Sequence, residues 1–250
     1  TVAWNVAEDL RMTLGSVFSQ SCTDYECIVK DGGSTDGTVA VAKSFLPNDR
    51  LRIISAPDEG IYDAMNRATA ASEGEWIIYL NAGDRFHDAA VLSRIKAHLP
   101  AVPPGVLYGN VLGCYPGYTV VHKPASLGLL WLRKPYHHQA MFITGEIARS
   151  TPFDLSYRIV ADHERGSRLF KAGVAFTYLD EPVASVDMRG GVSKDRYLET
   201  TLESMRVFRK HFFRWDRELR HWLHLGKLII IKNLPTGLLA PLRRLKNRKQ

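Results

Sequence analysis

The sequence predicts an α/β fold, with a mostly parallel central sheet flanked by helices and a basic helical tail behind it. Strand-like and helix-like segments alternate along the first half of the chain, and such alternation is typical of parallel sheets with helices on both sides. Residues 75–80 read Glu-Trp-Ile-Ile-Tyr-Leu, a nearly continuous apolar run that favours a strand buried on both faces. The tail is predicted from its charge, which differs in sign from that of the rest of the chain.

The first half is expected to begin with a strand and to alternate from there. Two polar loops, 31–38 and 81–84, follow predicted strands directly, and open α/β sheets bind ligands beyond the carboxyl ends of their strands. The opening residues 1–5 are typical of the second half of a buried strand, so we expect that native residues precede them. The expected strands are 1–4, 25–30, 51–54 and 75–80, and the expected helices are 7–19, 39–45 and 61–71.

The second half is less regular, because Pro- and Gly-containing turns interrupt it. A helix is expected to end at Gly173, since a glycine tolerates the left-handed conformation that commonly closes a helix. From about residue 195 onward the pattern favours helices. The strands expected in this half are 106–112, 118–122, 174–179 and 182–186, and the helix expected among them is 161–172.

Composition excludes several classes of protein. Of the 250 residues, 45% are hydrophobic and 24% charged, which excludes a disordered or collagen-like chain. The three cysteines form no Cys-x-x-Cys pair, which excludes a disulfide scaffold and a thiolate zinc site and suits a reducing cytoplasm. No apolar run reaches the length of about 18 residues that a transmembrane helix needs.

The net charge of +7 is unevenly distributed. Residues 206–250 carry 13 Lys and Arg against 2 Asp and Glu, a net charge of +11, whereas residues 1–205 carry 20 against 24, a net charge of −4. Trp and Leu residues are interleaved with these basic residues, as in an amphipathic helix that lies on an anionic membrane surface. A solvated helix packed on the body is the alternative, and long aliphatic side chains do not favour a nucleic-acid groove.

The loop 31–38 (DGGSTDGT) is rich in glycine but is neither a P-loop nor a dinucleotide-binding loop. It opens with Asp31, whose carboxylate can accept hydrogen bonds from a nucleobase or from sugar hydroxyls but cannot cradle a phosphate. A tight turn capped by Ser34, Thr35 and Asp36 is the alternative interpretation.

The loop 81–84 (NAGD) places a single carboxylate, Asp84, directly after the apolar strand. Such a carboxylate can hold a divalent cation when substrate phosphates supply the remaining oxygens, and the metal then neutralises the charge of a departing diphosphate. The alternative is that Asp84 caps a following helix.

Together the motifs resemble those of family 2 glycosyltransferases with the GT-A fold, and among them those of bacterial exopolysaccharide and colanic-acid-type enzymes. The resemblance covers about residues 1–200 and implies a GT-A domain over residues 1–205, with a Rossmann-like nucleotide-sugar half (1–100), an acceptor half (101–205) and the basic amphipathic tail (206–250). The motifs that carry it are DGGSTDGT (31–38), PDEGIYDAMN (57–66), NAGD (81–84), HQA (138–140) and ADHE (161–164).

The resemblance implies a nucleotide-sugar donor, linked to UDP or GDP, in the first half. Asp84 matches the last acid of a DxD-type motif, which holds Mg²⁺ or Mn²⁺ on the diphosphate. Because Asn81 and Gly83 stand where acids usually do, metal binding would depend on one carboxylate. The donor-binding positions implied are Thr1 and Val2 in the first strand, Asp31, Asp36, Asp58, Asp63 and Asn81.

In the acceptor half, Asp162 matches the family's catalytic base, which takes the proton of the attacking hydroxyl in an inverting transfer. Glu164 ranks second, and a helix cap is the alternative role of Asp162. His138 and Gln139 are expected to line the acceptor or donor-sugar pocket, or else to be structural. Gly190 and Gly191 resemble the family's mobile closing loop, with an ordinary turn as the alternative.

The function expected from the sequence is therefore an inverting glycosyltransferase acting on a lipid-linked saccharide in bacterial surface polysaccharide synthesis. Its expected location is cytoplasmic, peripheral at the inner face of the membrane, with residues 206–250 on the anionic surface. No nucleic-acid partner is expected. A sugar nucleotidyltransferase is the alternative enzyme, although the Gly- and Arg-rich loop of that class is absent. A catalytically inactive binding module for sugar nucleotides or nucleic acid is the third candidate.

Overall fold

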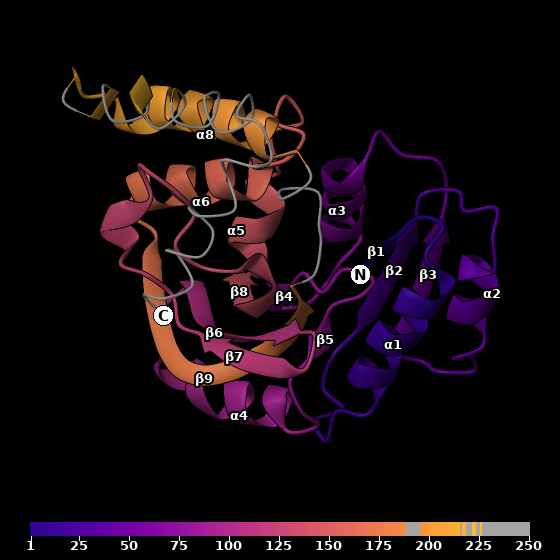
Figure 1. The fold of residues 1–250 in the computed structure, drawn as a ribbon. Helices are drawn as coiled ribbons and strands as arrows, with labels where there is room; N and C mark the ends of the chain where they lie inside the picture. The colour runs from indigo at the N-terminus through magenta and orange to yellow at the C-terminus, as the bar shows by residue number, and fades with distance from the viewer. Residues whose placement is uncertain (189–195, 216, 219–221, 224–225, 227–250) are drawn as a thin grey trace.

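A computed structural model describes residues 1–188, 196–215, 217–218, 222–223 and 226, and shows two sheets side by side with helices around them (Figure 1). The first half forms a parallel three-stranded sheet in the order β1-β2-β3. Each strand is followed by a helix, as predicted. The elements of this half are β1 (Val2–Ala3), α1 (Ala7–Phe18), β2 (Cys27–Asp31), α2 (Thr38–Lys43), β3 (Leu51–Ser55) and α3 (Ile61–Ala70).

The register of this sheet brings three loops to one edge. Ala3 lies opposite Asp31, and Asp31 lies opposite Ser55, so β1, β2 and β3 end level with one another. The central strand β2 is buried along its whole length, and α1 packs its apolar face, with Leu10 and Leu14 fully buried, into the same core. The loops after the strands therefore meet at the carboxyl edge, where a ligand site is expected.

The parallel sheet with its helices confirms the predicted α/β fold, and a second, mixed sheet lies beside it. Its order is β4-β8-β6-β9-β5, with β7 added on β6, and every pair in it is antiparallel except β6 with β9. The strand expected at 75–80 is β4 (Trp76–Ile78), which pairs with β8 and not with the parallel sheet. The further strands are β5 (Arg85–Phe86), β6 (Gly105–Tyr115), β7 (Tyr118–His122), β8 (Met141–Thr144) and β9 (Ala175–Asp187).

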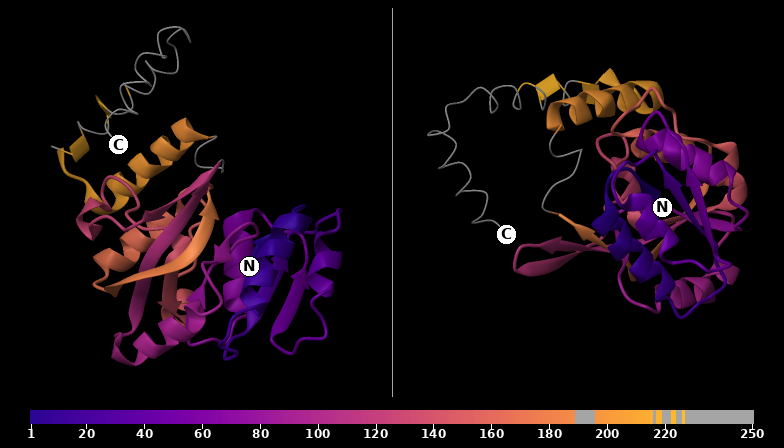
Figure 2. Two further views of the ribbon diagram at one scale, coloured as in Figure 1. Left: turned by 60° about the horizontal axis from the view of Figure 1, so that its bottom comes forward. Right: turned by 90° about the vertical axis from the view of Figure 1, so that its right-hand side faces the viewer.

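The strand β9 is continuous, whereas two strands were expected. Its pairing with β6 shifts register on both sides of Asn110, and this irregularity lets Pro182 lie within the strand. The partner strand has Gly109 at the crowded point, where a Cβ would lie 2.7 Å from the carbonyl oxygen of Glu181. The hairpin of β6 and β7 extends beyond the other strands (Figure 2).

Helices cover the second sheet on both sides (Figure 1). The helix α6 ends as predicted before Gly173, which has a φ of +77°. The helix α8 lies across α6 and buries Val207 and Phe208 completely. The helices of this half are α4 (Val91–His98), α5 (Gly145–Ser150), α6 (Ala161–Lys171) and α8 (Tyr197–Phe212), with short 3₁₀ turns at Leu99–Ala101, Leu127–Leu129 and His138–Ala140.

The expected division at residue 205 falls inside α8, because this helix runs on to Phe212. We therefore place α8 with the domain, and the tail begins after it. The predicted closing loop at Gly190 and Gly191 and the segment 227–250 lie outside the described residues. Within the described part of the chain, no helix is both long and apolar enough to cross a membrane.

Candidate active site

Asn5 joins the loops that follow β1 and β2. Its backbone N–H donates to the Ser34 hydroxyl at 2.8 Å, and its side-chain oxygen accepts the N–H of Thr35 at 2.9 Å. Asn5 has a φ of 52°, a conformation that asparagine tolerates better than most residues. On the other side, the carbonyl of Val2 accepts the N–H of Ala82 at 3.2 Å. The loops 31–38 and 81–84 are thus both attached to the end of β1.

Asp31 is buried and braces its own loop. Its carboxylate accepts the N–H groups of Gly33 at 3.0 Å and Ser34 at 3.1 Å and the hydroxyl of Ser55 at 2.7 Å. Burial alone would raise the pKa of Asp31, but these hydrogen bonds outweigh it and lower the pKa. Asp31 therefore stabilises the turn that it opens, and its contact with a nucleotide stays a prediction.

Asp58 is held by a buried lysine that the sequence analysis did not single out. The ammonium of Lys30 is fully buried and lies 2.9 Å from the Asp58 carboxylate. It also donates to the carbonyls of Asp31 and Ala56, both at 2.6 Å. A Cβ at Gly32 would come within 2.9 Å of the same carboxylate. This lysine therefore fixes the loops after β2 and β3 against each other.

Asp36 and Asp63 cap local structure near the same edge. Asp36 accepts the N–H of Thr38, the first residue of α2, at 2.8 Å. Asp63 accepts the N–H of Glu59 at 3.0 Å and forms an ion pair with Arg67 at 2.9 Å. Burial would raise the pKa of the half-buried Asp63, but its bonds outweigh burial and lower the pKa, and the bonds to Thr38 lower the pKa of the exposed Asp36. Any role of the two residues toward a nucleotide stays a prediction.

Trp4, which the sequence analysis did not select, follows β1 at the carboxyl edge. Its side chain is 66% exposed, and it lies against Gly32, where a Cβ would come within 3.3 Å of the indole ring. Thr1 lies at the other end of β1: it lines a cavity of about 740 Å³ together with Cys27 and Ile28. A tryptophan at the last position of a predicted strand, next to a polar loop, is the signal in the sequence that could have identified this position.

A second group of predicted residues comes together between the two sheets. The side-chain amide of Gln139 donates to the Asp84 carboxylate at 3.4 Å. The neighbouring His138 lies 3.4 Å from the Asn81 amide nitrogen and 3.1 Å from the Asp162 carboxylate. The structure therefore connects Asp84 to Asp162 through the 3₁₀ turn that contains His138 and Gln139. We call these five residues the transfer cluster.

Asp84 is almost completely buried, and burial raises its pKa to about 6, although His138, Gln139 and Lys134 act in the opposite direction. In the same turn, the Asn81 side-chain oxygen is buried and has no hydrogen-bond partner among the residues that the structure describes. A carboxylate and an amide oxygen are ligands that Mg²⁺ and Mn²⁺ accept, so this pair fits a metal completed by diphosphate oxygens. Among the described residues, no group of three or more His, Cys, Asp or Glu side chains could hold a metal alone.

Asp162 lies in the first turn of α6 and is bound from several sides. Its Oδ2 accepts the ammonium of Lys134 and the Nδ1–H of His138, while Oδ1 accepts the N–H of His163 at 2.8 Å. The hydroxyl of Tyr62 lies 3.4 Å from Oδ1. Burial would raise the pKa of Asp162, but the Lys134 and His138 contacts outweigh it and hold the pKa below its usual range. The carboxyl group is therefore ionised at neutral pH.

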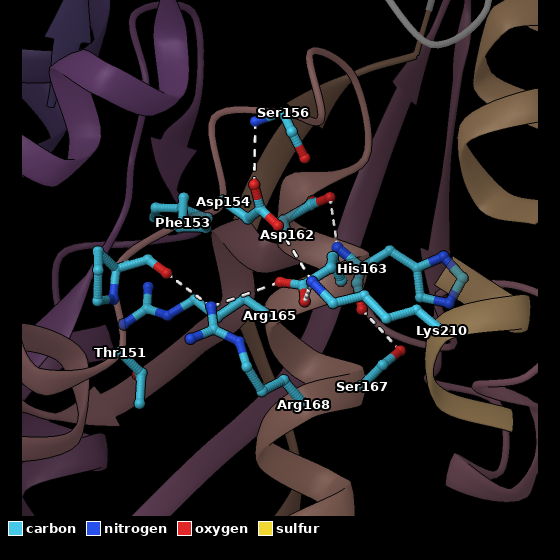
Figure 3. Close-up of polar contacts among 12 residues, drawn as sticks. Thr151, Phe153, Asp154, Ser156, Asp162, His163, Arg165, Ser167, Arg168 and Lys210 are labelled. Atoms are coloured by element: carbon cyan, nitrogen blue, oxygen red, sulfur yellow. Dashed lines mark hydrogen bonds and ion pairs between the residues drawn. The ribbon is translucent and has the colours of Figure 1, made fainter. Parts of the chain in front are cut away.

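Glu164, the second-ranked base, has another function in the fold. Its carboxylate is 0% exposed and accepts hydrogen bonds from Lys210 at 2.9 Å and His211 at 3.0 Å, both on α8. Arg168, one turn further along α6, lies 3.4 Å away. Figure 3 shows Lys210 between α8 and the start of α6, where it also contacts Asp154. A carboxylate enclosed in this way is not available to an acceptor hydroxyl.

Three comparisons with known proteins show the family and the fold of this chain. The family model described as glycosyl transferase family 2 matches residues 1–164. A PGL/p-HBAD biosynthesis glycosyltransferase of Mycobacterium bovis is 35% identical over 194 residues, which cover 76% of this chain and 75% of the relative, and a protein of the same description from Mycobacterium tuberculosis matches equally well.

Solved structures with low sequence identity share the fold. S. aureus TarS 1–349 in complex with UDP-GlcNAc superposes on 91% of this chain and 70% of its own, with a TM-score of 0.67 at 15% identity. The mannosyltransferase PcManGT of Pyrobaculum calidifontis, in complex with GDP-Man and Mn²⁺, covers 90% of this chain and 68% of its own, with a TM-score of 0.65 at 16% identity. Because the family model spans well over half of the sequence, the chain belongs to glycosyltransferase family 2, and it is a glycosyltransferase with the GT-A fold.

Proposed function

We propose that this protein is an inverting glycosyltransferase that moves a sugar from a UDP- or GDP-linked donor to a lipid-linked saccharide in bacterial surface or exopolysaccharide synthesis. The observation that carries the proposal is the transfer cluster, in which Gln139 contacts Asp84 and His138 contacts Asp162. A group suited to the diphosphate and a group suited to the acceptor proton thus lie on two sides of one short turn. An inverting displacement needs this arrangement.

In the proposed reaction the acceptor oxygen forms a bond to the anomeric carbon of the sugar. The bond between that carbon and the diphosphate oxygen breaks, and its electron pair leaves with the diphosphate. The acceptor proton passes to the carboxylate of Asp162, which is ionised at neutral pH because Lys134 and His138 hold its pKa low. His138 donates from Nδ1 and accepts the Asn81 amide at Nε2, so its ring is fixed in one orientation.

The donor would lie along the carboxyl edge of the parallel sheet. Trp4 offers an exposed aromatic face for a nucleobase, beside the loop that Asp31 braces. Asp84 and Asn81 would hold a divalent cation, which neutralises charge on the diphosphate when it is bound. Lys134 is close enough to lower the pKa of Asp84, so its ammonium also lies within electrostatic range of a diphosphate at that position.

The lipid-linked acceptor is supported by the surface beyond α8. Trp215 is 81% exposed, Trp222 is 53% exposed, and Arg209 stacks on the latter ring. Exposed aromatic rings among basic residues suit the interface of an anionic membrane. The mycobacterial relatives are named for PGL/p-HBAD biosynthesis, which is compatible with a glycoconjugate acceptor. We place the protein at the cytoplasmic face of the membrane.

The test is release of free UDP or GDP from a panel of sugar donors, with Mn²⁺, with Mg²⁺ and with EDTA. The expected result is acceptor-dependent release that falls when the metal is removed, with inversion at the anomeric carbon by NMR of the product. A matched control is Asp180→Asn, which changes an exposed carboxylate paired with Lys123. Pyrophosphate release from a nucleoside triphosphate would instead identify a nucleotidyltransferase, and donor binding without turnover would identify a binding module.

A further inference from the structure

The loop 158–160 leads directly into α6, two residues before Asp162, and a single carboxylate on α8 binds its backbone. Glu203 accepts the N–H of Arg158 at 2.9 Å through Oε1. Its Oε2 accepts the N–H of Ile159 at 2.9 Å and of Val160 at 3.0 Å. In the described part of the chain, these three N–H groups have no other acceptor. The conformation of the loop therefore depends on Glu203.

The opposite side of the same loop is bound by Tyr62, in the first turn of α3. The tyrosine hydroxyl donates to the carbonyl of Ile159 at 2.7 Å and lies 3.4 Å from Oδ1 of Asp162. The loop is thus held between α3, which begins at the nucleotide edge, and α8. Glu203 also places a negative charge at the amino end of α6, where the helix dipole favours it.

The packing of α8 does not depend on Glu203. Val207 and Phe208 are completely buried against the domain. Lys210 bonds Glu164 at 2.9 Å and Asp154 at 3.1 Å (Figure 3). These contacts remain when Glu203 is changed, so a variant at this position is expected to keep α8 in place while the loop 158–160 loses its acceptor.

We propose that Glu203 is a positioning residue for the transfer reaction: it fixes the loop 158–160 and thereby the direction in which the Asp162 carboxylate points. This proposal depends on the role of Asp162 in the proposed function. Glu203 acts through the backbone and touches neither donor nor acceptor. A displacement of a reacting group by about 1 Å can reduce a rate on the order of 100-fold, so a change in the loop is sufficient to affect kcat.

The variant Glu203→Gln keeps the shape of the side chain but replaces one acceptor oxygen by an NH₂ group, which cannot bond a backbone N–H. We expect kcat to fall on the order of 10-fold while the Kd for the nucleotide-sugar donor changes less than about twofold. Amide hydrogen exchange of the segment 158–160 should accelerate. Glu203→Asp keeps both acceptor oxygens and should recover part of kcat.

The matched control is Glu199→Gln, one turn earlier on α8, where the carboxylate is half exposed and, among the described residues, pairs only with Arg196. Its kcat should equal that of the unmodified protein. The decisive measurement repeats Glu203→Gln in the Asp162→Asn background. If Glu203 works through Asp162, it causes no further loss of the residual activity there. A merely structural role would reduce both activities by the same factor.

Three results would overturn the role of Glu203: a kcat of Glu203→Gln within twofold of the Glu199→Gln control, an equal loss in both backgrounds, or unchanged exchange of the segment 158–160. If Glu203→Gln does not fold, the same comparisons are made with Glu203→Ser, whose short side chain also lacks the carboxylate. Failure of the proposed function has a different signature, since the unmodified protein would then transfer no sugar from any donor. The exchange measurement still reports on the loop in that case.

Discussion

Lys134 forms an ion pair with Asp162, one of the five residues of the transfer cluster. A carboxylate beside an ammonium stays ionised, but its lowered pKa makes it a weaker base. Efficient proton transfer favours a pKa near the working pH. Lys134 therefore sets a compromise between having the base ionised and having it strongly basic. The contact also shields a buried carboxylate that would otherwise favour its neutral form.

Replacing Lys134 tests this compromise through the pH dependence of kcat. In Lys134→Met the ammonium is lost, and the pKa of Asp162 rises because one of the two groups that oppose the effect of burial is removed. Protonated Asp162 cannot accept a proton, so the acid limb of the kcat profile should move to higher pH. The profile is measured between pH 4 and pH 9. Lys123→Met, at an exposed lysine paired with Asp180, is the control, and an identical acid limb in Lys134→Met would refute the assignment.

Asp162→Asn removes the proton acceptor but leaves a side chain of the same size. In our proposal the donor lies along the edge of the parallel sheet, so the donor Kd should change little, while transfer should fall on the order of 100-fold or more. Donor affinity is measured by calorimetry and transfer by product formation. Asp180→Asn serves again as the matched carboxylate control, and transfer at the unmodified rate would exclude Asp162 as the base.

Residue by residue, the site could be predicted from the sequence only where short motifs contain it. Asp84, His138, Gln139 and Asp162 lie in such motifs, and the structure brings them together. Lys30 and Lys134 were not predicted, because each owes its role to an ion-pair partner 28 residues away in the chain. Composition and periodicity carry no information on such contacts, because the two residues meet only in the folded chain.

At the scale of elements, the first half could be predicted because its information is local. Apolar periodicity and glycine-rich turns locate α1, α2 and α3 and the strands β2 and β3 to within a few residues. The second sheet could not be assembled in the same way. The partner of β4 is β8, about 65 residues later in the chain. The apolar run of β4 does not distinguish a parallel from an antiparallel partner.

The element α8 is fixed to the domain by charge as well as by burial, and this attachment should depend on pH. Lys210→Met deprives the fully buried Glu164 of one partner, so unfolding free energy at pH 7 should fall by about 1–3 kcal/mol. Burial would raise the pKa of Glu164, but hydrogen bonds from His211 and Lys210 lower it. Hydrogen bonds from Ser156 and Lys210 lower the pKa of Asp154 to about 2.

Because both pKa values are depressed in the folded protein, the stabilisation is present above the unfolded values near pH 4 and is lost as the pH falls toward the folded values. The difference in stability between Lys210→Met and the unmodified protein should therefore shrink from pH 7 to pH 3. Urea unfolding at both pH values measures it, with Lys171→Met at the exposed end of α6 as the control. A difference that is constant with pH would exclude this charge contribution.

At the scale of the whole molecule, the acidic domain and the basic tail have separate tasks in our proposal. The domain contains every residue assigned to donor, metal or proton transfer, all before residue 165. Phe208 is 0% exposed, and Lys210 and His211 enclose Glu164, so a cut after residue 208 would damage the core. A truncation that tests the tail alone must leave α8 and the packed residues that follow it.

Removal of residues 227–250 meets this condition, because it deletes seven Lys and Arg and no Asp or Glu while retaining every residue that the structure describes. Each basic residue near an anionic surface contributes roughly 1 kcal/mol, so the truncated protein should bind anionic vesicles far more weakly. Activity on a soluble acceptor analogue should stay unchanged. Vesicle sedimentation across a salt series measures the binding.

The salt series tests whether electrostatic attraction holds the tail on the membrane, as we propose. Electrostatic attraction decays over a Debye length of about 8 Å at physiological ionic strength, so binding of the full chain should weaken as salt is added. Neutral vesicles are the control, since the exposed Trp215 and Trp222 remain in the truncated protein. If the full and truncated chains bind anionic vesicles equally, the basic segment does not bring the enzyme to the membrane, and the case for a lipid-linked acceptor loses its main support.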